Sequence, residues 1–219
     1  MSRSVKELSA SSPSFMRSLV LPSLKDVTLT TAYDIFETEN EVIKCPVSAL
    51  SALHEMLVQS QCFLTKLHLI NVVLNDNLAN IIQLVPGLQE FVIEFHEWVD
   101  EYDPIMESLV TQLSEMDLVD GSLQHSMVPS LQELSIYLYS LQYTHVSFID
   151  SAFVDMVASR VRRPPGSQRL TRLNLWVMGA RWSYDLVRED ENALNSLEGE
   201  GLELDFSTED GDPETDSDE

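Results

Sequence analysis

Five segments of the chain share the pattern Leu-x-x-apolar-x-apolar, in which the last two apolar residues are two positions apart. The segments begin at Leu24, Leu64, Leu88, Leu131 and Leu170. Residues two apart on a β-strand point to the same face, so each segment predicts a short strand with one buried face. The residues between the apolar positions are mostly polar, and they predict an opposite face that is open.

Between these segments the apolar spacing changes to three or four residues, which is typical of amphipathic helices. The sequence predicts helices over 47–58, 76–85, 103–113, 150–157 and 184–197. Asp76, Asp103 and Asp150 stand where an N-cap is expected, because a carboxylate there can accept hydrogen bonds from the free N–H groups of the first turn. A last strand is expected over 202–206.

Strands that alternate with helices predict a parallel sheet, because each helix returns the chain to the start of the next strand. A doubly wound α/β fold has the same alternation, but its central strands are buried on both faces and are continuously apolar. Here residues such as His68 and Ser135 interrupt the apolar positions. We therefore expect an α/β fold of the leucine-rich-repeat-like solenoid type, with a parallel sheet and helices on one side. The motifs begin 40, 24, 43 and 39 residues apart, so the repeats are irregular.

The charge is strongly negative, with 36 acidic and 13 basic residues and a formal net charge of −23. Nucleic acids and anionic membranes bind clustered cations, so neither is an expected partner. The dense basic run Arg160, Arg162 and Arg163 is interpreted as a solvated helix end. No apolar run is long enough to cross a membrane, and two cysteines, Cys45 and Cys62, do not suggest a disulfide framework. These features favour the cytoplasm or the nucleus.

Three regions are expected along the chain. Residues 1–14 are predicted to be a disordered N-terminal segment, 15–206 the repeat domain and 207–219 an acidic disordered tail. The tail has no apolar side chain that could be buried to offset the entropy of ordering. It is interpreted either as a solubilising terminus or as an arm for a basic partner.

Catalytic motifs are absent from the sequence. The five histidines are scattered, and no zinc pair, nucleophile elbow or phosphate loop is found. Cys62, which precedes an apolar strand, is interpreted as a small core residue. We expect no enzyme activity, no cofactor and no metal.

Several short segments resemble, in their order, the C-terminal part of mushroom-type fungal F-box proteins. These segments cover most of residues 15–206 and are Leu21-Pro-Ser-Leu24, Cys45-Pro46, Ser60-Gln-Cys-Phe-Leu64, Leu84-Val-Pro-Gly-Leu88, Val128-Pro-Ser-Leu131 and Met156-Val-Ala-Ser-Arg160. The resemblance implies leucine-rich-repeat-like units that hold the target of a ubiquitin ligase. Residues 1–20 are too short for an F-box, so the Skp adaptor and cullin are expected as partners only if an F-box is supplied elsewhere.

Aligning the five motifs places their outward residues in rows across the sheet. The residues expected to bind a protein partner on this concave face are His68, Glu94, Tyr137, Arg172, Asn174 and Trp176. Tyr137 and Trp176 are expected to be cross-strand neighbours, about 5 Å apart at the backbone. Tyr, Trp and Arg often anchor interfaces, although a long loop or the last helix could instead cover these aromatics.

Two functions follow from these features. The first is the target-binding part of an F-box-type ubiquitin-ligase adaptor. The second is a free-standing acidic leucine-rich-repeat scaffold that binds a basic protein. In both cases the chain is expected to be a monomer.

Overall fold

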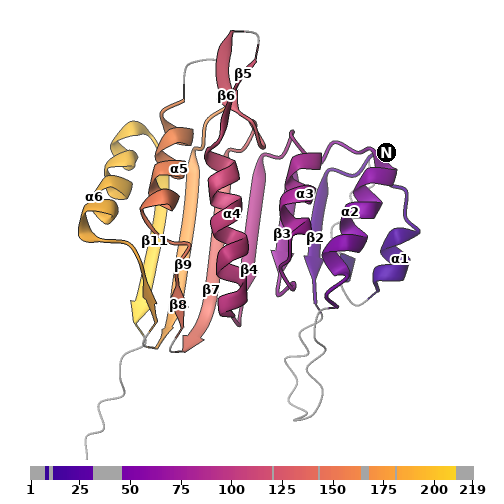
Figure 1. Cartoon of the computed structure of the whole chain (residues 1–219), viewed down its shortest axis with the longest axis horizontal. Helices are drawn as coiled ribbons and strands as arrows, with labels where there is room; N and C mark the ends of the chain where they lie inside the picture. Colours follow the sequence, from indigo (N-terminus) through magenta and orange to yellow (C-terminus); the bar gives the residue numbers. More distant parts are fainter. Residues whose placement is uncertain are drawn as a thin grey trace, which may run out of the picture.

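The computed structural model describes residues 8–9, 12–31, 46–119, 121–142, 144–163, 168–180 and 182–210. Its centre is a parallel sheet of seven strands, in which neighbouring strands follow the order of the chain. The strands are β1 (Leu8–Ser9), β2 (Asp26–Thr30), β3 (Lys66–Ile70), β4 (Glu90–Phe95), β7 (Glu133–Gln142), β9 (Arg172–Ala180) and β11 (Glu203–Asp210). Figure 1 shows β2, β3, β4, β7, β9 and β11 side by side in this order. The expected parallel sheet is confirmed, and the five motifs begin just before β2, β3, β4, β7 and β9.

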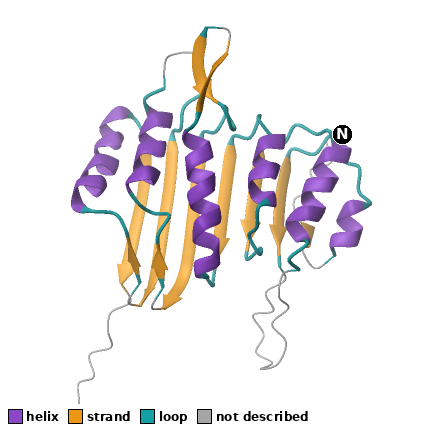
Figure 2. Cartoon of the chain, viewed as in Figure 1, coloured by secondary structure: helices purple, strands orange, loops and turns teal. Residues whose placement is uncertain are grey.

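Six α-helices connect or flank the strands in the part of the chain that the structure describes. They are α1 (Pro13–Arg17), α2 (Ala49–Ser60), α3 (Asn77–Leu84), α4 (Asp103–Ser114), α5 (Ser151–Val161) and α6 (Arg188–Ser196). Two short 3₁₀ helices, η1 (Asp100–Tyr102) and η2 (Leu197–Glu200), adjoin α4 and α6. Figures 1 and 2 show these helices in front of the sheet. Crossovers between parallel strands have one preferred hand, so crossovers that all step in the same direction place their helices on one face.

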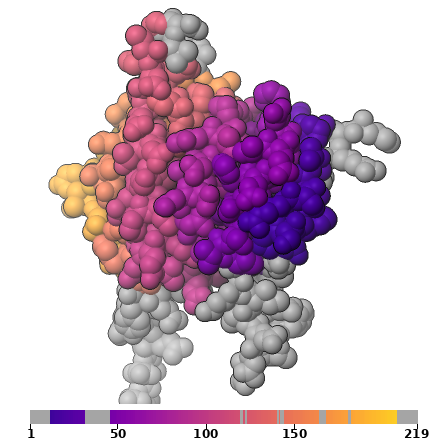
Figure 3. All heavy atoms as spheres, turned by 45° about the vertical axis from the view of Figure 1, so that its right-hand side comes forward, coloured from indigo at the N-terminus to yellow at the C-terminus, as the bar shows by residue number. Residues whose placement is uncertain are grey.

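Two small strand pairs lie outside the main sheet. β5 (Met116–Val119) and β6 (Ser122–His125) form an antiparallel hairpin, and β8 (His145–Val146) pairs with β10 (Ser183–Tyr184). The hairpin projects beyond the end of the sheet and forms the knob at the top of Figure 3.

The inner face of the sheet, which faces the helices, supplies the centre of the core. Its buried residues come from alternate positions of the strands and are Val27, Leu29, Leu67, Leu69, Phe91, Ile93, Leu134, Ile136, Leu138, Leu173, Leu175 and Val177. The predicted helices contribute their apolar faces to the same cluster, for example Leu53 of α2 and Ile81 of α3. The period of two in the strands and the period near 3.6 in the helices therefore meet in one core.

The predicted helix caps differ in their outcome. Oδ1 of Asp150 accepts a hydrogen bond from the N–H of Phe153 at 3.0 Å, which confirms this cap. Asp76 is at the N-cap of α3, but its side chain makes no capping bond, and Oδ1 of Asn75 accepts from the N–H of Asn77 instead.

Asp103 is wrong as a cap, because it is the first residue of α4 and is buried against the 147–148 segment. Burial raises the pKa of its carboxyl, and the backbone N–H of Phe148 opposes the rise. The carboxyl therefore packs between elements instead of closing the end of a helix.

Arg160 corrects the interpretation of the basic run, because its side chain is buried and the residue is only 1% exposed. Its guanidinium donates to the carbonyl oxygen of Leu113 from Nε at 3.1 Å and from Nη2 at 2.7 Å. It also donates to the carbonyl oxygens of Met127 at 2.9 Å and Val128 at 3.2 Å. Burial, with a smaller effect of the nearby Arg163, lowers the pKa of Arg160 to about 9. Arg162 is the exposed member of the run and forms an ion pair with Glu200 at 2.9 Å.

Val128, whose carbonyl oxygen accepts a hydrogen bond from Arg160, has a φ of +38°, an unusual conformation for a β-branched residue. His125, at the end of the hairpin, is 2% exposed. Burial lowers the pKa of His125 to about 4, and the charges of Arg160 and Arg163 contribute to the shift. The base of the hairpin therefore combines a strained turn with a neutral, buried imidazole beside a buried cation.

The two ends of the fold differ from the predicted domain boundaries where the structure describes them. β1, Ser12 and the start of α1 lie within the segment 1–14, and residues 1–7, 10 and 11 lie outside the described residues. At the other end, β11 continues to Asp210, and Ser207 and Thr208 pair with Trp176 and Val177 of β9. Assigning 207–210 to the tail is therefore wrong, and 211–219 lie outside the described residues.

Candidate protein-binding face

The outer face of the sheet comprises the residues of β2, β3, β4, β7, β9 and β11 that point away from the helices. The register of the strands places them in the predicted rows. The first row is Asp26, Lys66, Glu90, Glu133, Arg172 and Glu203, the second is Thr28, His68, Val92, Ser135, Asn174 and Asp205, and the third is Thr30, Ile70, Glu94, Tyr137, Trp176 and Ser207. The alignment made from the five motifs is therefore confirmed, and β11 extends each row by one residue.

The first row is a ladder of ion pairs at the amino-terminal ends of the strands. Lys66 pairs with Glu90, and Arg172 pairs with Glu133 at 3.2 Å and with Glu203 at 2.9 Å. The hydrogen bond that Lys66 donates to Glu90 is the largest of the effects that raise the pKa of Lys66. The hydrogen bonds that Arg172 donates to Glu203 are likewise the largest effect that raises the pKa of Arg172. Both cations of the row are thus already occupied by carboxylates of the same chain.

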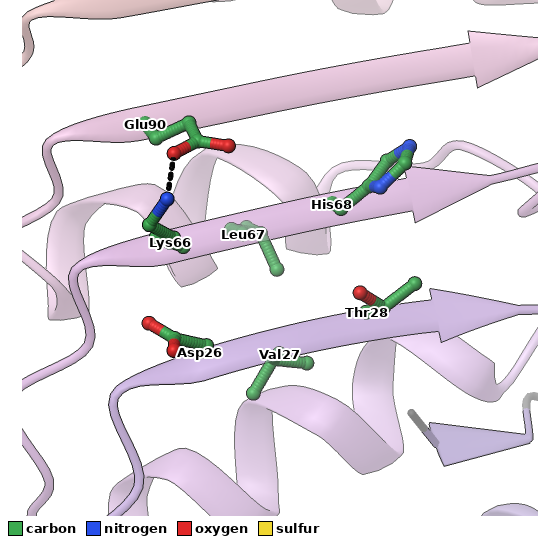
Figure 4. Close-up of a pocket in the computed structure, with 7 residues that line it drawn as sticks. All are labelled: Asp26, Val27, Thr28, Lys66, Leu67, His68 and Glu90. Atoms are coloured by element: carbon green, nitrogen blue, oxygen red, sulfur yellow. Dashed lines mark hydrogen bonds and ion pairs between the residues drawn. The ribbon is translucent and has the colours of Figure 1, made fainter. Parts of the chain in front are cut away.

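A hollow of about 280 Å³ lies over the first two rows, between β2, β3 and β4. Asp26, Thr28, Lys66, His68 and Glu90 contribute to its lining. Figure 4 shows the Lys66 ammonium directed at the Glu90 carboxylate, with His68 farther along β3. Val27 and Leu67 complete the lining, so the hollow combines polar and apolar surface and is open to solvent on one side.

The second row is closed in its middle and open at its ends. Val92 is 8% exposed and Ser135 is 1% exposed, although both lie on the outer face. Nδ2 of Asn174 donates to Oγ of Ser135 at 2.8 Å, and Nε2 of His68 lies 3.2 Å from Oε2 of Glu94 in the third row. These bonds tie the polar side chains of adjacent strands together and fix their orientation.

An aromatic group made of His96, Tyr137, Tyr139 and Trp176 covers the carboxyl-terminal ends of β4, β7 and β9. Tyr137 meets Trp176 edge to face with ring centroids 5.9 Å apart, and stacks with Tyr139 at 6.2 Å. The ring of His96 lies 5.2 Å from that of Tyr139. Tyr137, Tyr139 and Trp176 are all half-buried, so part of each residue is accessible.

The polar atoms of Trp176 and Tyr139 are affected by their surroundings. Nε1 of Trp176 is buried and has no hydrogen-bond partner among the described residues. Burial raises the pKa of Tyr139, and the carboxylate of Glu94 adds to the rise. The aromatic group therefore lies within the field of a carboxylate and contains a polar hydrogen without an acceptor.

Gly179 of β9 sits where β7 and β9 lose their regular register, between Leu138 and Leu141. A Cβ atom at position 179 would lie 1.9 Å from the carbonyl oxygen of Leu141. Only glycine allows the two backbones to approach so closely beside the aromatic group.

The six residues expected to bind a partner all lie on the outer face. The structure brings Glu94, Tyr137 and Trp176 together in one row, and joins His68 to Glu94 by a hydrogen bond. Arg172 lies one row removed from Asn174 and is held by Glu133 and Glu203. The arginine therefore belongs to the ion-pair ladder rather than to the aromatic group.

Tyr139 and His96 were missed by the sequence analysis. β7 continues beyond its motif to Gln142, and Tyr139 follows Tyr137 by the two residues that keep a strand side chain on one face. This spacing could have identified Tyr139. His96 follows β4 directly, and only the three-dimensional arrangement places its ring on Tyr139.

The outer face carries an excess of negative charge. Among the side chains that the structure describes in the three rows, the two cations are Lys66 and Arg172, and the six carboxylates are Asp26, Glu90, Glu94, Glu133, Glu203 and Asp205. Asp205 has no ion-pair partner among the described residues. The face is therefore complementary to a cationic surface.

Other candidate sites are less developed. No group of three or more His, Cys, Asp or Glu in the described parts of the chain is placed to hold a metal ion. None of the described helices is both long enough and apolar enough to span a bilayer. Cys62 is half-buried against the core, as expected, and burial raises the pKa of its thiol, whereas Cys45 lies outside the described residues. Comparison with protein-family models, with curated proteins and with solved structures gives no match.

Proposed function

We propose that this chain is a protein-interaction domain, an irregular leucine-rich-repeat-like solenoid that binds its partner on the outer face of the sheet. The observation that carries the proposal is that Tyr137, Tyr139 and Trp176 of the aromatic group are half-exposed on a mostly polar sheet face. Tyr and Trp side chains are enriched among the residues that anchor protein interfaces. The ordered hydrogen bonds around them reduce the entropy that binding would cost.

Within this proposal, the chain acts as the target-binding part of an F-box-type ubiquitin-ligase adaptor in the cytoplasm or nucleus. The support is the resemblance of its strand and helix segments to the repeats of mushroom-type fungal F-box proteins. In that arrangement the outer face holds the target, and an F-box supplied elsewhere recruits the Skp adaptor and cullin.

A second candidate is a free-standing scaffold for a basic protein. The net charge of −23 and the excess of carboxylates on the outer face favour it. Its complexes would weaken steeply as salt screens the charges. The two candidates use the same face and differ in what else is bound.

Photo-crosslinking of the full chain in extract of its own cells tests the proposal. A benzoylphenylalanine replaces Ser207, which pairs with Trp176 on the outer face, and in a matched control it replaces Asn192 on the exposed side of α6. We expect covalent adducts from position 207 and not from position 192. Adducts from the helix side alone would place the binding surface elsewhere and reject the proposal.

Two double variants add a second readout. Tyr137→Ala with Trp176→Ala should abolish capture of the crosslinked protein, whereas Phe15→Ala with Val187→Ala removes exposed apolar side chains of the helical side and should leave it unchanged. Skp adaptor and cullin recovered with the crosslinked protein would support the ligase adaptor. Basic proteins recovered without them would support the scaffold.

A further inference from the structure

We propose that the aromatic group together with Glu94 binds a lysine or arginine side chain from an extended basic segment of the protein partner. This inference rests on the proposed function and specifies the chemistry that the outer face recognises. It assigns the site to Glu94, Tyr137, Tyr139 and Trp176, with His96 at its border.

The geometry of the rings suits a cationic side chain. Tyr137 and Trp176 meet nearly at right angles, with an interplanar angle of 76°, so the face of one ring and the edge of the other form a corner. Tyr139 stacks almost parallel to Tyr137, at 6°, and extends the wall along the strand. A lysine or arginine stem is long and apolar and can lie along such a wall, while its charge interacts with the ring faces.

Glu94 supplies the negative charge at the same place. It is in register with Tyr137 on the neighbouring strand, and its carboxylate is close enough to contribute to the raised pKa of Tyr139. The imidazole of His68 lies 3.2 Å from Oε2 of Glu94. Oε1 takes no part in that contact, so it can accept a hydrogen bond from a cation of the partner.

The two cations of the outer-face rows do not compete for this site. Arg172 lies on the same strand as Trp176 but two rows away, and it is bonded to Glu133 and Glu203. Lys66 lies on β3 in the same row as Arg172 and is bonded to Glu90. The rings and the Glu94 carboxylate are therefore not covered by either cation of these rows.

An extended segment fits the remainder of the face. Successive rows of a sheet lie about 7 Å apart along the strands, which matches the distance between alternate side chains of an extended peptide. Glu94 on β4 and Asp205 on β11 are three strands and one row apart, about 16 Å at a strand spacing of about 4.8 Å. An extended segment that crosses the strands obliquely could therefore place one cation at Glu94 and another, four residues along, near Asp205. The excess of carboxylates in the three rows selects a basic segment over an acidic one.

The test uses a fluorescein-labelled ten-residue peptide of alternating lysine and threonine as probe, titrated with the full chain and followed by anisotropy. A peptide with acetylated lysines keeps the stems and removes the charges. We expect the charged peptide to bind and the acetylated one to bind at least about 10-fold more weakly. Trp176→Leu, which leaves the net charge unchanged, should weaken binding by about 2- to 30-fold, the range of a cation–π contact.

As a control for net charge, the peptide affinity of Glu94→Gln is compared with that of Glu198→Gln. Glu198 is an exposed residue of η2 on the helical side. Both changes remove one negative charge, so diffuse attraction predicts equal effects, whereas the proposed site predicts a loss for Glu94→Gln alone. Equal binding by the parent, Trp176→Leu and Glu94→Gln would overturn the inference. Urea midpoints equal to that of the parent establish that the variants are folded.

Failure of this inference is distinguishable from failure of the proposed function. Adducts from position 207 without lysine-dependent binding would leave the outer face as the binding surface and reject its cationic specificity. Lysine-dependent binding at Trp176 without any adduct from position 207 would keep the cation site and reject the outer face as the surface used in cells.

Discussion

The buried guanidinium of Arg160 is expected to stabilise the carboxyl-terminal half of the fold, and Arg160→Met tests this role. Methionine is unbranched and has an apolar end, so it fills most of the space but donates no hydrogen bond. The carbonyl oxygens of Leu113 and Met127 would lose the hydrogen bonds that they accept from this side chain. The carbonyl oxygen of Val128 would keep the N–H of Leu131 at 3.1 Å.

The magnitude follows from the carbonyl groups of Leu113 and Met127. Each buried acceptor without a partner costs about 1–3 kcal/mol, so the two together cost about 2–6 kcal/mol. Removing a buried charge offsets part of this cost, because burial of the guanidinium is itself unfavourable, as its lowered pKa of about 9 indicates. We expect a loss of about 3 kcal/mol in the free energy of unfolding, an estimate from the cost of unsatisfied acceptors. The protein should remain folded, since a domain is stable by about 5–15 kcal/mol.

Urea denaturation followed by circular dichroism measures this loss. With an m-value of about 2 kcal/mol per M, the midpoint should fall by about 1.5 M. Arg162→Met is the matched control, because the exposed Arg162 is bonded to Glu200 at the surface, and no resolvable shift of the midpoint is expected. An unchanged midpoint for Arg160→Met would refute the reasoning, since it would mean that the guanidinium costs as much to bury as its hydrogen bonds contribute.

Three further predictions concern glycine, capping and pH. Gly179→Ala should lower the free energy of unfolding by about 2 kcal/mol, because the new Cβ would clash with the backbone of Leu141, and no side-chain rotation can relieve that clash. In Gly199→Ala, the control, the new Cβ has no atom within 4 Å, so little effect is expected, and urea midpoints compare the two variants. Asp150→Ala should lower the free energy of unfolding by about 1 kcal/mol and Asp76→Ala by much less, because only the Asp150 side chain caps its helix. Chemical denaturation measures both losses, and equal losses would contradict the assignment of the cap. Burial lowers the pKa of His125 to about 4 in the folded chain, whereas it is about 6.5 in the unfolded chain. Between these pH values the unfolded chain binds more protons than the folded chain, so the free energy of unfolding should decrease by up to about 3 kcal/mol as pH falls from about 6.5 to 4. His125→Gln should flatten that part of the stability–pH curve, and a parallel curve would show that other groups cause the loss.

The rows of side chains on the outer face could be predicted almost entirely from local sequence. The period of two within each motif fixes which residues face the helices, and burying those residues aligns the motifs of neighbouring strands. Tyr137 beside Trp176, and Glu94 beside Tyr137, follow from this alignment. The sequence by itself therefore determined the parallel sheet, its chain-ordered strands, the side-chain rows and the negative charge of the face.

The tertiary structure decided the features that depend on contacts between distant segments. In the sequence Arg160 resembles the exposed end of a basic run, yet it is buried, and the carbonyl of Leu113, 47 residues away, accepts its hydrogen bonds. The strand β11 extends past its apolar residues to Asp210 because β9 offers backbone partners along its length. His96 joins Tyr139 only because β4 and β7 are neighbours. Such contacts bring together groups that no local period relates, so a pattern along the chain cannot reveal them.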